Sequence, residues 1–471
     1  MNTRRRTIHI IMGFVLFAFF SVILADALTP SGAKAIGTMV WMMYWWITRP
    51  FHIAITGLVP VLVNAFFSIS SMDILASQYI SDSIILIFGS GLLTIPWAKC
   101  GLDKRISLRV LSIIGPSMTS QITVWLLASI FLSAVLPNVM VCAVFSPIAV
   151  SMLKAVGHHN IDESESAVPI LLAIGWGVSL GGARSPLGGA MNLVAISYLE
   201  DFTGKEFMYV DWFKTMVPYM IFASLVLLIF MLVMSRGSKP LDGSRKFFIE
   251  SYKELGKMNR DEKICATLFI LAMVAAFARP LYAELLPSFT PAYMFLVFGS
   301  INFFITSMDK SLFLDWEDAE KHTLWGLMIS FAGGMALGKL INESGATDAL
   351  VGFIINMNLD GGLTTVILFV TITRMIAEVT NGTTAAAIMV PIMFAFTGKM
   401  GLDPRPFWFI GIMAFNYEYL LPISVRAIPV SHGLSPVHLL KKGWMIAVIS
   451  TIFVIIYGYV SMTLFPNFGM I

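Results

Sequence analysis

A series of long apolar segments constrains this chain more than any other feature, because several match the length of a helical membrane crossing. They fall near residues 8–25, 37–48, 51–68, 83–98, 121–155, 168–202, 213–235, 264–282, 290–307, 323–340, 361–398, 404–430 and 443–465. Only 13% of the 471 residues are charged, against about 25% in soluble domains. The sequence therefore predicts an all-α polytopic membrane protein with about 11 transmembrane helices.

Four of these segments carry polar interruptions. Segments 121–155 and 361–398 are too long for one crossing and break at Leu136-Pro137-Asn138-Val139 and Val379-Thr380-Asn381-Gly382-Thr383-Thr384. Each is expected to form a re-entrant helical hairpin. Segments 168–202 and 404–430 contain Gly/Pro-rich loops around Arg184 and Arg426, which predicts two broken helices.

An internal repeat relates the two halves of the chain. Phe88-Gly89-Ser90-Gly91 matches Phe331-Ala332-Gly333-Gly334, Asn138 matches Asn381, Pro147-Ile148 matches Pro391-Ile392, and Arg184 matches Arg426. These pairs occur in the same order and at nearly the same separation. An odd number of crossings between the copies would make them inverted repeats. Interrupted apolar segments at matching places in two halves indicate a transporter binding site.

Charge predicts the topology. With eleven crossings and a cytoplasmic N-terminus, most Lys and Arg residues fall in cytoplasmic stretches, as the positive-inside rule requires. The apolar run after Arg4-Arg5-Arg6 lacks a clear cleavage site and is expected to be a retained first span rather than a signal peptide. The C-terminus would lie outside the cell membrane, of a bacterium by expectation. The expected parts are a scaffold (1–110), a transport part (111–235), a cytoplasmic linker (236–263), a second scaffold part (264–360) and a second transport part (361–471).

Arg184 and Arg426 interrupt segments that otherwise belong in the membrane. A charge at that depth costs roughly 2.5–3.5 kcal/mol on insertion scales, so a functional role is the default hypothesis. A structural ion pair is the alternative, and Glu418 is near enough in sequence to neutralise Arg426. Arg374 and Glu378 are four residues apart, which favours a structural pair on one helix face.

The chain resembles the divalent-anion:sodium symporter family, the INDY-like di- and tricarboxylate transporters, over nearly its whole length. That family carries a Ser-Asn-Thr triplet at each hairpin tip, with a proline nine residues after the Asn. Asn138 with Pro147 fits the first tip, and the position counted back from Pro391 is Gly382. The family's Gly/Pro-rich loops match the frames around Arg184 and Arg426. The resemblance implies a homodimer, a scaffold and a mobile part that moves like an elevator, and a di- or tricarboxylate substrate.

The departures from this pattern bear on sodium. The triplets read Pro137-Asn138-Val139 and Asn381-Gly382-Thr383, so ligand oxygens are lost at both tips. Each broken-helix loop has gained a guanidinium, which has no acceptor and cannot coordinate a cation. Two unit charges 4 Å apart interact by about 4 kcal/mol at an effective dielectric of 20. We therefore expect Arg184 and Arg426 to replace bound sodium, as in a sodium-independent exchanger branch.

The expected site binds a small dianion between the two tips. Arginine suits a carboxylate because its planar fork donates two parallel hydrogen bonds, and half-helix N-termini add further donors. Counting +2 for the empty site and zero for the loaded one predicts one-for-one, largely electroneutral antiport of 2-oxoglutarate, malate, succinate or fumarate. The candidate substrate-binding residues are Pro137, Asn138, Val139, Arg184, Ser185, Thr380, Asn381, Gly382, Thr383, Thr384, Ser424 and Arg426. Asn138 and Thr383 have capping of the hairpin helices as their alternative role.

Other functions are less well supported. The alternatives are a sodium-coupled di- or tricarboxylate symporter, a citrate/dicarboxylate exchanger and a passive anion channel. A membrane enzyme is not expected, because neither a His-Glu-x-x-His motif nor an activated nucleophile is visible. We expect no cofactor, metal or nucleic acid, and name the lipid bilayer, the anion and a second copy as partners. The stretch 100–113, with Lys104, Arg105 and Arg109, is expected to be an amphipathic interfacial helix.

Overall fold

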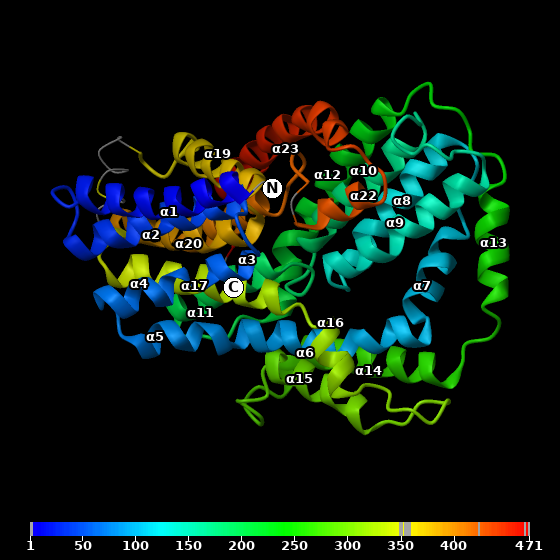
Figure 1. Ribbon diagram of the computed structural model, residues 1–471, viewed down its shortest axis with the longest axis horizontal. Helices are drawn as coiled ribbons and strands as arrows, with labels where there is room; N and C mark the ends of the chain where they lie inside the picture. The colour runs from blue at the N-terminus through cyan, green and yellow to red at the C-terminus, as the bar shows by residue number, and fades with distance from the viewer. Residues whose placement is uncertain (1–2, 348–351, 353–358, 423, 466–467, 470–471) are drawn as a thin grey trace.

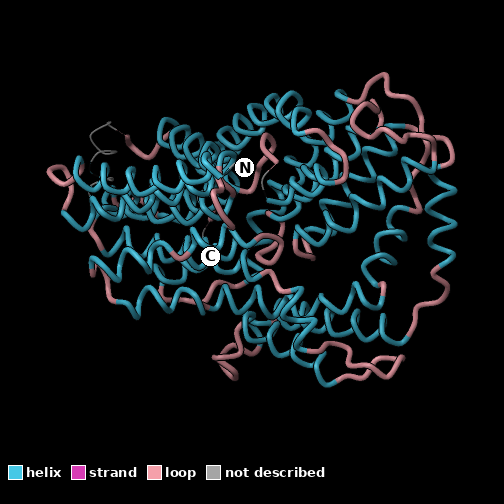
Figure 2. The backbone as a smooth tube through the Cα atoms, in the orientation of Figure 1, coloured by secondary structure: helices cyan, strands magenta, loops and turns pink. Residues whose placement is uncertain are grey.

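The computed structural model describes residues 3–347, 352, 359–422, 424–465 and 468–469. Within these ranges the protein is built from helices and loops, with one isolated β-bridge between Thr306 and Leu312. Figure 2 shows helices throughout the molecule. This confirms the prediction of an all-α membrane protein.

The first half of the chain contains a run of helices, then a hairpin, then a broken pair (Figure 1). The helices are α1 (Thr3–Ile23), α2 (Pro30–Thr48), α3 (Ile53–Gly57), α4 (Val59–Phe67), α5 (Met72–Ser77), η1 (Gln78–Ile80), α6 (Asp82–Cys100), α7 (Leu102–Leu111), α8 (Met118–Ser133), α9 (Asn138–Ala155), α10 (Ala167–Gly182), α11 (Ala190–Thr203) and α12 (Tyr209–Met234).

The second half repeats that order of elements after a connecting helix. Its helices are α13 (Ser244–Glu254), α14 (Arg260–Phe277), η2 (Arg279–Leu281), α15 (Pro291–Ile301), η3 (Asn302–Phe304), α16 (Trp316–His322), α17 (Trp325–Glu343), α19 (Leu363–Val379), α20 (Gly382–Met400), α21 (Pro404–Phe415), η4 (Ser424–Arg426), α22 (Ala427–Ser431) and α23 (Pro436–Leu464). The hairpins α8/α9 and α19/α20, and the interrupted pairs α10/α11 and α21/α22, break where the sequence predicted.

Six helices in the described part of the chain are long and apolar enough to cross a membrane, and seven if the bent pair α16/α17 counts as one span. The bend in that pair is 59°. Several other apolar helices are shorter, among them α8, α10 and the joined α3/α4. The protein is therefore a polytopic membrane protein, with fewer full-length spans by this measure than the eleven expected from sequence.

Local sequence explains where the hairpin and linker helices begin. Asn381 caps α20, its side chain accepting the N–H of Thr384 at 2.9 Å, as a short polar side chain does at a helix start. Asn259 and Glu262 form a reciprocal capping box that starts α14. Pro137 has no N–H to leave unpaired and precedes the first turn of α9.

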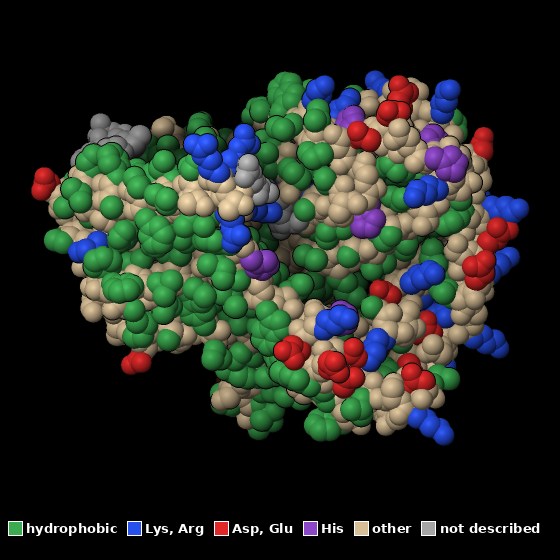
Figure 3. Space-filling model, viewed as in Figure 1, with side chains coloured by type: hydrophobic (Ala, Val, Ile, Leu, Met, Phe, Trp, Pro, Cys, Tyr) green, Lys and Arg blue, Asp and Glu red, His purple; other side chains and the backbone are tan. Residues whose placement is uncertain are grey.

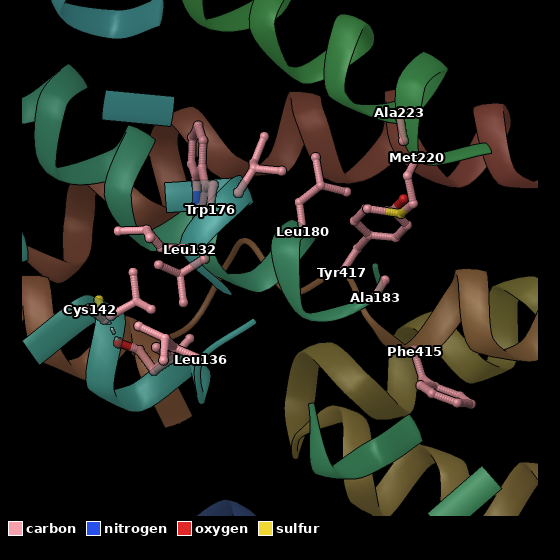
Figure 4. Packing of buried hydrophobic residues seen from close by; sticks show 14 of the residues in the cluster. Leu132, Leu136, Cys142, Trp176, Leu180, Ala183, Met220, Ala223, Phe415 and Tyr417 are labelled. Atoms are coloured by element: carbon pink, nitrogen blue, oxygen red, sulfur yellow. Dashed lines mark hydrogen bonds between the residues drawn. The ribbon is translucent and has the colours of Figure 1, made fainter. Parts of the chain in front are cut away.

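The core gathers the hairpins and the broken helices around buried aromatic residues. Figure 4 shows Leu132, Leu136 and Cys142 of the first hairpin lying together, with Trp176 and Leu180 of α10 beside them. Small residues allow this close packing. A Cβ added to Gly181 would lie 2.5 Å from the carbonyl oxygen of Ile130 in α8, so only glycine fits there.

The stretch expected to form an interfacial helix and the expected linker make contacts with each other that the sequence does not show. Stretch 100–113 forms α7, whose apolar face packs against α13 rather than lying free for a membrane surface. Arg105 is buried and donates to Glu262 Oε1 at 2.6 Å and to the carbonyl oxygen of Gly256 at 2.8 Å. The linker 236–263 is thus partly helical and anchored (α13, at the right of Figure 1). An amphipathic pattern reveals an apolar face, but not what covers it.

Candidate functional site

The four interruptions meet at one cavity of about 780 Å³. Its wall includes the first hairpin tip, the α10–α11 break, the second hairpin tip and the α21–α22 break. The tip residues that line it are Pro137, Asn138, Val139, Asn381, Gly382 and Thr383. Figure 3 shows a hollow near the middle of the molecular face, with Lys, Arg and His side chains around its rim. The interrupted segments that the repeat relates in sequence therefore lie around the same cavity.

The first tip is held by hydroxyl and carbonyl oxygens. Ser133 Oγ lies within hydrogen-bonding distance of Asn138 Oδ1 and, at 2.9 Å, of the carbonyl oxygen of Val178 in α10. Ser185 Oγ donates to the carbonyl oxygen of Ala134 and accepts the N–H of Gly188 at 3.1 Å. Ser185 thus ties the tip to the α10–α11 break and does not line the cavity itself.

A second contact brings α10 against this tip. A Cβ added to Gly182 would lie 2.5 Å from Asn138 Nδ2, closer than real Cβ atoms approach. Asn192 at the start of α11 donates to the carbonyl oxygens of Gly182 at 2.8 Å and Ser185 at 2.9 Å. The position of the Asn138 side chain therefore depends on the absence of a side chain at residue 182.

The second tip is held by a carboxylate. The N–H of Gly382, the first residue of α20, donates to Glu418 Oε1. Thr383 is 8% exposed and faces the cavity, while Thr384 and Thr380 are buried without lining it. Thr380 Oγ1 donates to the carbonyl oxygen of Ile376 at 2.6 Å, within its own helix.

Arg426 is fully buried behind this tip and lies between two carboxylates. Its Nη2 donates to Glu418 Oε2 at 2.8 Å and its Nη1 to Glu378 Oε2 at 3.2 Å. Glu378 also accepts the N–H groups of Tyr419 at 2.8 Å and Leu420 at 3.0 Å. Arg426 does not line the cavity, whereas Glu418 does.

Arg374 completes this charged cluster. Its Nη2 lies 3.6 Å from Glu378 Oε1, which confirms the predicted pair on one helix face. With two arginines and two glutamates the cluster sums to zero when all four are ionised. The count of two uncompensated charges is therefore wrong for Arg426, because sequence could not show that Glu378 and Glu418 both reach it.

Arg184 points elsewhere. It lies in the α10–α11 break and donates from Nη2 to Ser224 Oγ of α12 at 2.9 Å. Its Nε is buried and has no hydrogen-bond partner within the described ranges. Arg184 is not among the residues that line the cavity. The remaining candidate, Ser424, belongs to η4, but its side chain lies outside the described residues.

Several residues that sequence reasoning missed connect these parts. Asn416 Nδ2 donates to Asn192 Oδ1 at 2.9 Å, joining the two broken helices in the core. Trp408 Nε1 donates to the carbonyl oxygen of Ala195 at 2.7 Å, and Trp176 Nε1 to that of Tyr419 at 3.3 Å. These bonds link the two halves of the chain, and no short-range motif in the sequence marks them.

Two hairpins and two interrupted helices around one cavity, within a polytopic membrane protein, define a multi-pass membrane transporter. In the described part of the chain, no group of three or more His, Cys, Asp or Glu residues is placed to hold a metal ion. The chain belongs to the citrate transporter family, whose model matches residues 43–414. This membership confirms that the chain is a transporter and not an enzyme.

Curated relatives extend over almost the whole chain. The sodium-dependent dicarboxylate transporter SdcS of Staphylococcus saprophyticus is 24% identical over 475 residues, covering 96% of this chain and 90% of the relative. The protein of that name from Staphylococcus aureus is 25% identical over 476 residues, covering 97% and 91%. The resemblance to di- and tricarboxylate transporters is thus confirmed at the level of the family.

Proposed function

We propose that this chain carries small dicarboxylates across the cell membrane and binds the anion between the two hairpin tips. The observation that supports this most is that α9, beginning at Asn138, and α20, beginning at Gly382, both start at the wall of one cavity. Each helix N-terminus is equivalent to roughly half a positive charge. The two together suit one carboxylate group each of a dianion.

Asn138 and Thr383 provide the side-chain contacts in this proposal. Asn138 Nδ2 is a donor suited to a carboxylate oxygen, because Oδ1 of that side chain lies at Ser133 Oγ. Thr383 adds a hydroxyl donor at the other tip. Succinate, malate, fumarate and 2-oxoglutarate all carry two carboxylates that such a pair of tips would hold. Citrate is the larger alternative.

We propose sodium-independent, one-for-one exchange as the transport mode. Arg426 supports it, because a fixed cation already lies behind the second tip and holds Gly382 through Glu418. Exchange of one dianion for another moves no net charge. An empty site would leave the N-terminus of α9 without an anion, whereas Glu418 already accepts from that of α20. The uncompensated N-terminus disfavours the return of an empty carrier.

Sodium-coupled symport is the second candidate, and the names of the relatives favour it. The first tip gathers neutral oxygen atoms from Ser133, Asn138 and Val178, and unwound backbone oxygens in transporters are ligands for Na⁺. In that case Arg426 would replace a sodium ion at the second tip, and a sodium ion would still bind at the first tip. The two candidates share the anion site and differ in the transport mode, which is exchange in the first and sodium-coupled symport in the second.

The cavity rim supports an inward-facing state. Arg49, Lys99 and His322 line the cavity, and the positive-inside pattern assigns their stretches to the cytoplasm. The inverted repeats, the elevator motion and the homodimer that the resemblance implies are part of this proposal.

Counterflow in proteoliposomes tests the site. Vesicles preloaded with unlabelled succinate should take up labelled succinate, and Asn138→Ala and Thr383→Ala should each lower the rate about tenfold or more, as loss of a charge-assisted hydrogen bond implies. Lys104→Gln, an exposed residue away from the cavity, serves as the control. Wild-type rates in both tip variants would contradict the proposed site.

A further inference from the structure

The cavity is also lined by polar and basic residues outside the hairpin tips. Arg49 follows the last residue of α2, His52 caps α3, and His322 is the last residue of α16. All three line the cavity, together with Thr323. Lys99, which also lines the cavity, is already paired with Asp318. The other basic groups form a set distinct from the tips.

Arg49 is the charged member of this set. Its backbone adopts the left-handed conformation (φ 46°, ψ 56°), which costs a non-glycine residue roughly 1–2 kcal/mol. Its guanidinium has no hydrogen bond or ion pair with any side chain in the described part of the chain. Burial, and to a lesser degree the charge on Arg426, lowers the pKa of Arg49. The Arg49 side chain is nevertheless exposed at the cavity, and no carboxylate of the described residues pairs with it.

Thr323 is the second indication of a ligand. It is 9% exposed and lines the cavity, yet its Oγ1 is buried without a hydrogen-bond partner among the described residues. A buried hydroxyl left unpaired costs about 1–3 kcal/mol. Rotation of the Thr323 hydroxyl toward a ligand oxygen in the cavity would remove that cost.

The two histidines each keep one ring nitrogen available. His52 Nδ1 accepts the N–H of Ala54 at 3.3 Å, so Nε2 carries the proton of the neutral ring. His322 Nδ1 lies 2.9 Å from the carbonyl oxygen of Asp318 and donates to it, so Nε2 is an acceptor in the neutral ring and can donate to an anion only when the ring is protonated. Neither Nε2 has a protein partner within the described ranges.

We propose that Arg49, His52, His322 and Thr323 form a second anion site, which binds the carboxylate of an incoming organic acid before it reaches the hairpin tips. The guanidinium suits a carboxylate through two parallel hydrogen bonds. The cavity, at about 780 Å³, is in the range that encloses drug-sized ligands. A four- or five-carbon acid at the tips would fill only part of this volume, which leaves room for a second anion at Arg49.

This second site would affect how fast the organic acid binds from solution, and not how fast the loaded carrier moves it across the membrane. A cation in a cleft attracts anions and raises their rate of association. Arg49 would do so locally, in a cavity that Asp103, Asp318 and Glu418 also line. The inference rests on the proposed function only for the identity of the anion. Loss of the second site should raise KM while the maximal rate stays, because the tip site is intact.

Equilibrium binding and counterflow of labelled succinate test the inference in the purified full-length protein. We expect two succinate molecules per protomer in wild type and one in Arg49→Gln. In liposomes, Arg49→Gln should raise KM about five- to tenfold from the side to which the cavity opens, with the maximal rate within about twofold. His322→Gln should shift KM in the same direction, and Arg49→Lys should shift it less.

The control is Lys104→Gln, which removes one exposed charge from α7 and does not alter the cavity wall. A single site in wild type with an unchanged KM in both Arg49→Gln and His322→Gln would overturn the second site alone. Loss of all binding in folded Arg49→Gln would also overturn it, because Arg49 would then belong to the tip site. Wild-type protein that neither binds nor exchanges succinate would overturn the proposed function as well.

Discussion

Arg426 Nη2 donates to Glu418 Oε2 at 2.8 Å, and the other oxygen of that carboxylate accepts the N–H of Gly382 at the second hairpin tip. One side chain thus connects a fully buried guanidinium to the residue that begins α20 at the cavity wall. The charge of Arg426 acts on the site through Glu418 and not by direct exposure. Through this contact a buried permanent cation is joined to the wall of the proposed anion site.

Removing Glu378 should destabilise the protein strongly. Glu378→Ala leaves Arg374 with no carboxylate partner among the described residues and removes one carboxylate from Arg426, while two backbone N–H groups lose their acceptor. Breaking a buried pair costs about 3–5 kcal/mol. Thermal unfolding in detergent should show a clear fall in Tm.

The matched control for this change is Glu250→Ala. Glu250 pairs with Lys246 at 3.7 Å on an exposed face of α13, and exposed pairs contribute about 0–1 kcal/mol. Equal Tm values for Glu378→Ala and Glu250→Ala would show that the buried cluster does not stabilise the fold.

Gly182→Ala should disturb the first hairpin tip. The added methyl would lie 2.5 Å from Asn138 Nδ2, so the Asn138 side chain or helix α10 must move. We expect succinate counterflow to fall about tenfold, since displacement of a binding group by about 1 Å is costly. Gly398→Ala is the control, because a Cβ there meets nothing within 4 Å. Wild-type counterflow in Gly182→Ala would mean that the position of Asn138 does not matter.

Cys100 and Cys265 should cross-link on mild oxidation. Their sulfur atoms lie 3.5 Å apart, between the end of α6 and the start of α14, and both are free thiols. Transfer of two electrons to a small disulfide reagent, which leaves as two thiols, should form one intramolecular bond. Peptide mass spectrometry would detect it, with the buried Cys142 unmodified as the internal control. A Cys142 adduct without the Cys100–Cys265 bond would contradict the arrangement.

Arg105→Gln should loosen the linker between the halves. Arg105 holds Glu262 and the carbonyl oxygens of Gly256 and Leu255 at 2.6, 2.8 and 3.0 Å. Loss of this buried group should cost about 3 kcal/mol locally and speed trypsin cleavage after Lys257. Arg109→Gln, which removes only an exposed guanidinium 5.5 Å from the ring centroid of Tyr252, should leave cleavage near the wild-type rate. Equal cleavage rates in the two variants would show that the hydrogen bonds of Arg105 do not hold the linker in place.

The sequence predicted the hairpins and the broken helices because Pro, Gly and Asn interrupt apolar runs within a few residues of each break. The repeat places Asn138 and Asn381 at matching points of the two hairpins, and both line the one cavity. The sequence did not predict the partners of Arg426, because Glu378 lies 48 residues away and only tertiary packing brings it close. For the same reason the sequence did not show that Arg49 and Thr323 line the cavity. It predicted a helix near α7, but not that α13 packs against it.

In the proposed exchange mode, Arg426, held by Glu418 and Glu378, fixes the second hairpin tip without a bound sodium ion. The most direct test is counterflow of labelled succinate into succinate-loaded proteoliposomes, with choline or sodium as the only external and internal cation. The account predicts uptake at the same rate in choline and in sodium, and little uptake into vesicles without internal dicarboxylate. Uptake that appears only with sodium, including uptake into empty vesicles, would contradict it and establish sodium-coupled symport.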